Sequence, residues 1–550
     1  MQYISKDLGP GTIKILNNRG YKTDKEIEDF LNFNESNIPS FDLLPDIKKF
    51  LDRVNKSLFL GEEITIYADY DCDGASSGAI MVNCLRKLGL KVNFFTNDRF
   101  IEGFGMQIDG VKRLLNQYPK TNLIITVDNG IVAFEGVDYA NQCGIDVIIT
   151  DHHEPDQTGA LPNAVAIVDC KRYDNTYPFT ECCGAGIAYK LMKALYASEH
   201  INDDVVREQL PYVALATVAD CVPLIQENRL YVKEGLKMIG NNKVFNRLAY
   251  LLKINKFDEE TFGYYIGPII NANSRLNGNA LKPIELFTTK DENRINQICD
   301  ELIAVNNLRK KYTTEETDKA VEIIEQKGLN NRKILIVQDD SFQEGIVGII
   351  AGRLVELYNK PAIVFSRHGI DEFKGSARSL EGFNIKESCD EISDCIENYG
   401  GHAMAAGITI KEDNFDEFYN RLESLIDESK IIIPQSADKA IDYEYSIGEL
   451  NMKMIDEIEM LKPFGEGFPS INLCLKDFIV EEKRMLKDIH LKLHNETNQT
   501  DVLLFNTGQD LDKIVTEGDS LKIIGTPKVN VFNGKVTYNI ILKDINCCIK

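Results

Sequence analysis

The chain has 550 residues, of which 43% are hydrophobic and 27% charged, a balance typical of soluble globular proteins with several domains. Asp and Glu outnumber Lys and Arg by 85 to 62, so the formal net charge is −23 and the chain as a whole does not attract polyanions. Any phosphate binding must therefore use local basic pockets or metal ions. No run of about 18 apolar residues predicts a membrane span. The N-terminal sequence and the 13 scattered cysteines predict a cytoplasmic protein with reduced thiols.

The hydrophobic patterns predict a helical N-terminal segment followed by an α/β domain. Residues 1–55 are polar and helical in character. In residues 56–225, short β-branched or apolar runs at 64–67, 92–95, 123–127 and 147–150 alternate with amphipathic stretches. Such alternation is typical of a doubly wound parallel sheet with helices on both faces, so we expect an α/β fold.

Three further regions follow. Residues 226–330 are expected to be helical, and apolar residues at helical spacing between 290 and 327 predict a connecting helix that would be ~55 Å long. Residues 331–435 predict a second, smaller α/β domain. After a linker, 436–550 contain short strands and an Asn-Gly hairpin signal, which predict an oligonucleotide-binding (OB-type) barrel. The candidate nucleic-acid contacts in that hairpin are Lys528, Phe532, Lys535 and Tyr538.

Acidic side chains and histidines follow successive predicted strands. The first strand leads into 69–74, the third into 128–130 and the fourth into 151–153, while Asp220 follows an apolar helix. The carboxyl ends of parallel strands meet at one edge of a sheet, where ligands bind. So many carboxylates in one crevice need a counter-charge, and oxygen ligands with one or two histidines suit Mn²⁺ or Mg²⁺. Two such ions can clamp a phosphoryl group and activate water.

These four segments resemble the motifs of the DHH phosphoesterase superfamily: Asp69-Tyr70-Asp71-Cys72-Asp73-Gly74, Val127-Asp128-Asn129-Gly130, Asp151-His152-His153, and Asp220 with Pro223. The resemblance implies that two divalent cations, preferably Mn²⁺ or else Mg²⁺, are held by Asp71, Asp73, Asp128, His152 and Asp220, with Asp128 bridging. It also implies that Asp69 is an accessory acid and that His153 faces the scissile phosphate.

Further segments are similar to the RecJ branch of that superfamily, and they cover nearly the whole chain. They surround Arg99, Arg275, Gly345 and Phe464, and the second α/β region adds the glycine-rich stretch 399–407. The resemblance implies that DNA phosphates, some at the 5′ end, are contacted by Arg99, Arg275, Ser376, Arg378, Gly400, Gly401 and His402. The sequence departs from the RecJ pattern at Ile269, Ser274, Gln343 and Phe468, which puts DNA affinity in question rather than hydrolysis.

The leading hypothesis implied by the resemblance is a metal-dependent 5′→3′ exonuclease that hydrolyses single-stranded DNA to 5′-mononucleotides in DNA repair and recombination. It would act as a monomer, with a single-strand-binding protein and a helicase as partners and no membrane attachment. Two alternatives stay open. One is a phosphodiesterase of short oligonucleotides or cyclic dinucleotides, and the other is a non-catalytic replication scaffold.

Overall fold

The computed structural model describes residues 4–432, 441–446, 449–497, 499–506, 508–532, 535–542 and 548–549. The chain divides into two compact units. Unit 1 comprises Met1–Ile38, Pro223–Leu230 and Pro434–Lys550, and unit 2 comprises Pro39–Val222 and Tyr231–Ile433. The domain boundaries expected at 55, 225, 330 and 435 stay predictions.

The first sheet of unit 2 has five parallel strands in the order β2-β1-β3-β4-β5. Its strands are β1 (Glu63–Ala68), β2 (Lys91–Thr96), β3 (Thr121–Val127), β4 (Asp146–Thr150) and β5 (Ala166–Val168). The predicted doubly wound sheet is confirmed, and β5 is a strand that the sequence did not predict. Because the strand order reverses beside β1, the crevice between the ends of β1 and β3 is the topological switch point where such sheets bind ligands.

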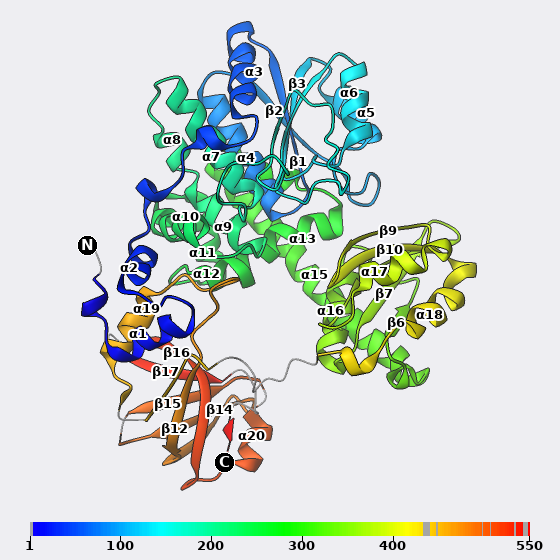
Figure 1. The fold of residues 1–550 in the computed structure, drawn as a ribbon. Coiled ribbons are helices and arrows are strands. Elements are labelled where there is room, and N and C mark those ends of the chain that lie inside the picture. The colour runs from blue at the N-terminus through cyan, green and yellow to red at the C-terminus, as the bar shows by residue number, and fades with distance from the viewer. Residues whose placement is uncertain are drawn as a thin grey trace. The chain divides into compact units, whose positions relative to one another are not determined.

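Helices cover both faces of this sheet (Figure 1). One face packs Tyr67 and Phe95 against α5 (Ile108–Gln117) and α6 (Phe134–Gln142). The other face meets α4 (Cys72–Lys87) and α7 (Gly184–Ser198). Both faces are apolar because β-branched residues fill consecutive positions of the strands, as expected for a parallel sheet buried on both sides.

Helices follow the first sheet in the chain and lead into the second one. They include α9 (Leu210–Ala219), α11 (Lys243–Leu252), α13 (Gly267–Asn277) and α14 (Leu281–Thr288). The predicted long helix is confirmed as α15 (Glu292–Gln326), which has 35 residues. α15 packs against α13 and against α16 (Val347–Tyr358), so it links the two sheets of unit 2 (Figure 1).

The second sheet is mixed, with the order β6-β7-β8-β10-β9. Its strands are β6 (Leu335–Gln338), β7 (Ala362–His368), β8 (Glu372–Arg378), β9 (Asn398–His402) and β10 (Ala405–Lys411). Along β6, Leu335 and Val337 pack toward α16, whereas Ile336 packs toward α18 (Phe415–Ser424). This alternation confirms a second α/β domain with helices on both faces.

Unit 1 contains the C-terminal β domain. Its sheet runs β11-β12-β16-β17-β15-β14-β13, with β18 (Cys548–Ile549) pairing to β16. The strands are β11 (Tyr443–Ser446), β12 (Leu473–Ile479), β13 (Glu482–Leu486), β14 (His490–Asn495), β15 (Thr500–Leu504), β16 (Ser520–Phe532) and β17 (Lys535–Leu542). The antiparallel β16–β17 pair confirms the hairpin, although its turn at 533–534 and the side chains of Phe532 and Lys535 lie outside the described residues.

The N-terminal helices share the core of this β domain. In α1 (Pro10–Asn18), Ile15 and Leu16 lie in the same apolar cluster as Ile455 of α19 (Met452–Met460) and Leu473 of β12. The Glu457 carboxylate accepts hydrogen bonds from the Gly9 N–H at 3.0 Å and the Thr12 hydroxyl at 2.5 Å. Segments more than 400 residues apart therefore form one hydrophobic core.

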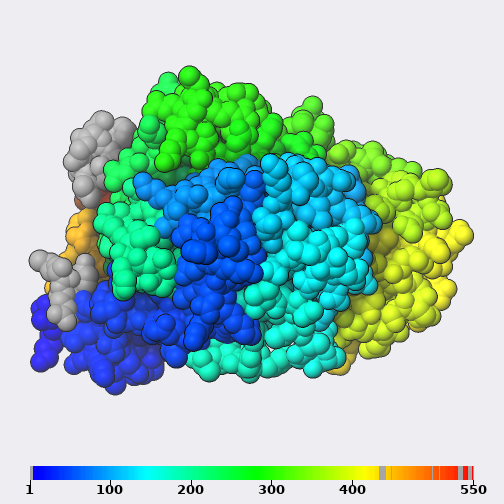
Figure 2. Space-filling view, turned by 90° about the horizontal axis from the view of Figure 1, so that it is seen from above, coloured from blue at the N-terminus to red at the C-terminus, as the bar shows by residue number. Residues whose placement is uncertain are grey.

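None of the helices in the described parts of the chain is long and apolar enough to cross a membrane. In unit 2, the residues from α3 (Ile47–Leu60) to α6 form a continuous surface, coloured blue to cyan in Figure 2.

Candidate metal and phosphate site

The predicted acids meet at the switch point of the first sheet. Asp69 and Asp71 follow β1, Asp128 follows β3, His152 follows β4 and Asp220 caps the C-terminus of α9. Their oxygen and nitrogen atoms approach within 4.8 Å of one another in overlapping groups: Asp73, His152 and Asp220; Asp69, Asp71 and Asp128; and Asp128, His152 and His153. All six predicted carboxylates and imidazoles of the metal set, including Asp69, are therefore brought together.

Helix N-termini position two of these carboxylates. Asp71 is the N-cap of α4, and one of its oxygens accepts hydrogen bonds from the N–H groups of Asp73 at 2.9 Å and Gly74 at 3.0 Å. The Asp73 carboxylate accepts from the Gly184 N–H at 2.6 Å and the Ala185 N–H at 2.8 Å at the start of α7. Free N–H groups at a helix start attract anions, so two helices hold the acids in place.

Close backbone packing fixes Asp128. Its φ is +62°, a left-handed conformation that Asp and Asn tolerate better than most residues. Gly184 lies directly against it, because a Cβ on Gly184 would be 2.8 Å from the Asp128 Cβ. Gly74 is equally constrained, since its Cβ would lie 2.5 Å from the Asp69 carbonyl oxygen. Small residues therefore allow the acidic segments to converge.

His152 points a nitrogen at three carboxylates. Its Nε2 lies 3.0 Å from an Asp128 oxygen, 3.6 Å from Asp220 and 3.7 Å from Asp73, and none of these contacts has hydrogen-bond geometry. The imidazole also hydrogen-bonds with the Cys182 backbone. Burial, followed by the charge of His153, lowers the pKa of His152 to about 3, so the imidazole is neutral and presents a lone pair to the acids.

Nearby cations do not offset the effect of burial on these carboxylates. Burial and then Asp71 raise the pKa of Asp73 to about 6, and burial and then Asp73 raise the pKa of Asp220 to about 9. Burial and neighbouring acids also raise the pKa values of Asp69 and Asp128. One oxygen of each of these two residues is buried without a hydrogen-bond partner. Unpaired buried oxygens facing an imidazole lone pair fit divalent cations that prefer oxygen ligands.

The second histidine of the pair has a different environment. His153 Nδ1 lies 2.7 Å from Asp151, whose same oxygen also accepts the His152 N–H. Burial opposes the charged imidazole, but the hydrogen bond and charge of Asp151 outweigh it and raise the pKa of His153 to about 9. His153 is therefore cationic at neutral pH, and its ring contacts the half-exposed Phe104 edge-on at 5.3 Å.

Asp169, which directly follows β5, is a further acid at this edge that was not predicted. It is fully buried, and burial together with the charge of Asp151 raises its pKa to about 8. The sequence contains a pattern that indicates this acid, because Asp169 follows the apolar run 165–168 in the way that Asp128 follows the run 123–127. The first sheet therefore carries acids beyond four neighbouring strands.

Arginines gather next to the acids. Burial, and then the charges of Arg99, Arg309 and Arg378, lower the pKa of Arg275 to about 10. Arg353 in turn lies close enough to Arg309 to lower its pKa further, after burial. In the described part of the chain, none of these five arginines has a carboxylate ion-pair partner. Guanidinium groups in such a cluster suit an anion, and Arg309 and Arg353 were not predicted as part of it.

Ser376 and Arg378 lie together on β8, beside the start of α16. Arg378 donates to the Ser376 hydroxyl at 2.9 Å and to the Ala377 carbonyl at 2.7 Å. A Cβ on Gly348 would be 2.9 Å from that hydroxyl, so glycine lets the first turn of α16 approach both side chains. Arg275 reaches the same place, donating to the Gly345 carbonyl at 3.3 Å.

The predicted Gly400, Gly401 and His402 lie on the exposed edge strand β9. His402 pairs with Ala405, which pairs with Arg378, so the histidine is at the same end of the sheet as Arg378 but two strands away, ~10 Å. Three of the four departures from the RecJ pattern are in the interior, and Gln343 is exposed. Ile269, Ser274 and Phe468 are each about 2% exposed, and the Gln343 N–H donates to Glu316 at 3.0 Å.

Comparisons with known proteins agree with this architecture. Residues 63–217 match the DHH family, N-terminal domain; residues 331–428 match the DHHA1 domain; and residues 441–544 match the RecJ OB domain. The single-stranded-DNA-specific exonuclease RecJ of Bacillus subtilis is 34% identical over 550 residues, which cover 97% of this chain and 68% of the relative. RecJ of Escherichia coli is 28% identical, with 98% and 96% covered.

Solved structures show the same relationship. The structure of Thermus thermophilus RecJ in complex with Mn²⁺ has a TM-score of 0.79 at 25% identity and covers 98% of this chain and 76% of that one. A structure of an exonuclease RecJ bound to manganese has a TM-score of 0.61 at 28% identity, covering 70% and 95%. Fold and site thus define a DHH-type phosphoesterase with DHHA1 and OB domains. Within that class, the chain belongs to the RecJ family of single-stranded-DNA-specific exonucleases.

Proposed function

We propose that the protein binds single-stranded DNA at its 5′ end and releases 5′-mononucleotides with the help of two divalent cations, Mn²⁺ or Mg²⁺. The observation that carries the proposal is the adjacency of two buried clusters of opposite charge: the acids around His152 Nε2 and the arginines around Arg275. A cation and a phosphodiester together would neutralise both.

Each residue then has a distinct task. The cations would be held by Asp71, Asp73, Asp128, His152 and Asp220. Asp128 would be shared, because its ligand atoms lie within 4.8 Å of those of Asp69 and Asp71 and also of those of His152. When bound, the cations supply charge stabilisation at the phosphoryl oxygens and activation of the attacking water. His153, fixed by Asp151 and cationic at neutral pH, would donate a hydrogen bond to the scissile phosphate as negative charge develops.

The second sheet would select the strand end. Arg275, Ser376, Arg378 and the first turn of α16 can bind a phosphate together, which supports recognition of a terminal 5′-phosphate. Arg99, whose guanidinium stacks 5.1 Å from the Tyr70 ring, would bind a neighbouring phosphate next to the acids. Gly400, Gly401 and His402 would extend this surface.

The test uses purified protein, Mn²⁺ and single strands labelled at either end, with blunt duplex and dinucleotide as competing substrates. The proposal predicts that the 5′ label is released first, as a mononucleotide, and that the duplex is resistant. Release of the 3′ label first, equal cutting of duplex, or a dinucleotide hydrolysed faster than the long strand would each contradict it. A complex with a single-strand-binding protein or helicase, and the monomeric state, stay predictions.

A further inference from the structure

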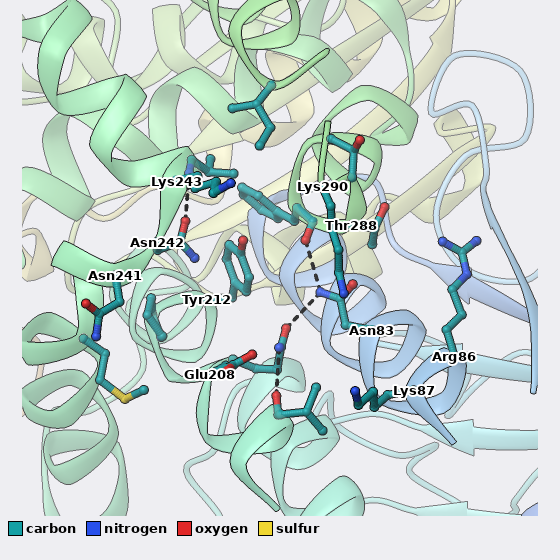
Figure 3. Close-up of a pocket in the computed structure, with 18 residues that line it drawn as sticks. Asn83, Arg86, Lys87, Glu208, Tyr212, Asn241, Asn242, Lys243, Thr288 and Lys290 are labelled. Atoms are coloured by element: carbon teal, nitrogen blue, oxygen red, sulfur yellow. Dashed lines mark hydrogen bonds between the residues drawn. The ribbon is translucent and has the colours of Figure 1, made fainter. Parts of the chain in front are cut away.

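A cavity of about 660 Å³ lies in unit 2 between the C-terminal end of α4, the starts of α9 and α11, and the segment joining α14 to α15 (Figure 3). Its volume is within the range of sites that hold small molecules. It is separate from the acids of the metal site. Asn83, which lines it, follows Asp73 by ten residues on the same helix, ~15 Å along the axis.

The rim of the cavity is basic although the chain is strongly acidic. Arg86, Lys87, Lys243 and Lys290 line it, against one acid, Glu208. Lys243 pairs with Glu292 at 2.6 Å and Arg86 donates to the Val92 carbonyl at 2.7 Å. Lys87 and Lys290 have no ion-pair partner in the described parts of the chain, and both are exposed. Two uncommitted ammonium groups at one opening favour an anionic ligand.

The interior combines hydrogen-bonding groups with apolar surface. Asn83 is held in place by donating to the Gln209 side chain at 2.9 Å and the Phe287 carbonyl at 3.1 Å. Tyr212 packs on Phe287 with ring centroids 4.6 Å apart and lies between the basic residues of the rim (Figure 3). Val205, Pro211 and Met238 add apolar wall, and Asn241, Asn242, Thr288 and Thr289 add polar groups.

We propose that this cavity binds a nucleoside monophosphate. That ligand class has the three properties that the lining requires: an anion for Lys87 and Lys290, polar edges for the asparagines and threonines, and a flat, partly apolar base. The inference rests on the proposed function, because 5′-mononucleotides are the products of the proposed reaction. The site would therefore bind product away from the reacting phosphate.

Two helices connect the cavity with the candidate metal ligands. α4 begins at the acids with Asp73 and ends at the cavity with Lys87, while α9 begins at the cavity with Pro211 and Tyr212 and ends at Asp220. The two helices pack against each other. A ligand that shifts either helix at the cavity end would move a carboxylate at the other end, so we expect bound nucleotide to change the affinity for Mn²⁺, ~5-fold or more.

The experiment exploits the absence of tryptophan from the chain. Asn241→Trp places a single reporter at the exposed rim, and Tyr250→Trp is the matched control, because Tyr250 is 76% exposed on α11 and does not line the cavity. Both variants are titrated with dTMP, thymidine or inorganic phosphate in EDTA. We expect saturable quenching by dTMP at position 241 only, with thymidine and phosphate binding at least 10-fold more weakly. No quenching, equal quenching at both positions, or equal binding of phosphate would overturn the proposal.

A second measurement covers the case in which the reporter variant misfolds. Calorimetric titration of the unmodified chain with dTMP is compared with Lys87→Ala/Lys290→Ala and with the control Lys120→Ala, an exposed lysine outside the cavity. The double variant should lose at least 10-fold in affinity and the control should not. Equal affinities in all three proteins would contradict the site. Binding without strand cleavage would count against the proposed function alone, and cleavage without cavity binding against this inference alone.

Discussion

The two sheets of unit 2 collect opposite charges. The first sheet brings Asp73, Asp128 and Asp220 around a neutral imidazole, and the second contributes Arg378 and Ser376 to a group of arginines centred on Arg275. Apart from the contacts of the neutral His152, neither cluster forms an ion pair with an opposite charge in the described part of the chain. Each cluster alone destabilises the folded protein, because buried charges of the same sign repel one another and lose their hydration. The difference supports the proposal that this unit binds ligands of both signs, with cations at the first sheet and phosphates at the second.

The largest effect should come from the acidic side. Asp128→Asn keeps a residue that tolerates the φ of +62° but removes the shared charge. We expect kcat to fall roughly 1,000-fold. The metal-free variant should be as stable as the parent or more so, by about 1 kcal/mol, because a buried uncompensated charge is lost. Thermal melting with and without Mn²⁺ checks this: Mn²⁺ should stabilise the parent but not the variant. Retained turnover would refute the shared ligand.

In the arginine cluster, Arg275→Met removes the guanidinium that the charges of three neighbouring arginines repel. We expect kcat/KM on 5′-phosphorylated strands to fall about 10- to 100-fold, as for a lost charged hydrogen bond, and the salt dependence of binding to weaken by about one ion. Stability should not fall, because Arg275 is repelled by Arg99 and Arg378. Arg247→Met is the control, since Arg247 pairs with Asp300. Unchanged kinetics on 5′-phosphorylated strands would show that this arginine cluster does not bind the DNA.

The outer arginines should contribute less. Arg309→Ala and Arg353→Ala each remove one cation whose side chain bonds only to neutral groups: the Asn306 side chain and the Thr313 carbonyl. We expect KM for long single strands to rise roughly fivefold, about 1 kcal/mol, with kcat unchanged. Steady-state kinetics on long and short strands measure this. A fall in kcat with constant KM would place these residues in the chemical step instead.

The smallest effect concerns the Asp151–His153 pair. Because Asp151 raises the pKa of His153 to about 9, the pair stabilises the folded metal-free protein fully below pH ~6.5 and loses that contribution as the pH rises through about 9. His153 is partly solvent-exposed, so we expect only about 1 kcal/mol. Urea unfolding in EDTA at pH 6 and pH 10, compared with Asp151→Asn, measures it. A variant with the same pH dependence as the parent would contradict the pairing.

The sequence predicted those parts of the fold that carry a local signal. The β-branched runs located β1 to β4, helical spacing located α15, and acids at strand ends located the metal set. The polar, glycine-containing strands β8 and β9 have no such run, so they were missed. Arg309 and Arg353 look like ordinary charged positions of helices. The shared core of α1 and α19 joins distant segments, which no local pattern reveals.

The central claim is that carboxylates from separate strand ends hold divalent cations beside an arginine-bound phosphate. Anomalous diffraction from crystals soaked in Mn²⁺ tests it most directly. We predict two peaks, one contacted by Asp73, His152 and Asp220 and the other by Asp69 or Asp71, with Asp128 at both. Mn²⁺ peaks at full occupancy elsewhere, with no peak beside these side chains, would contradict the account.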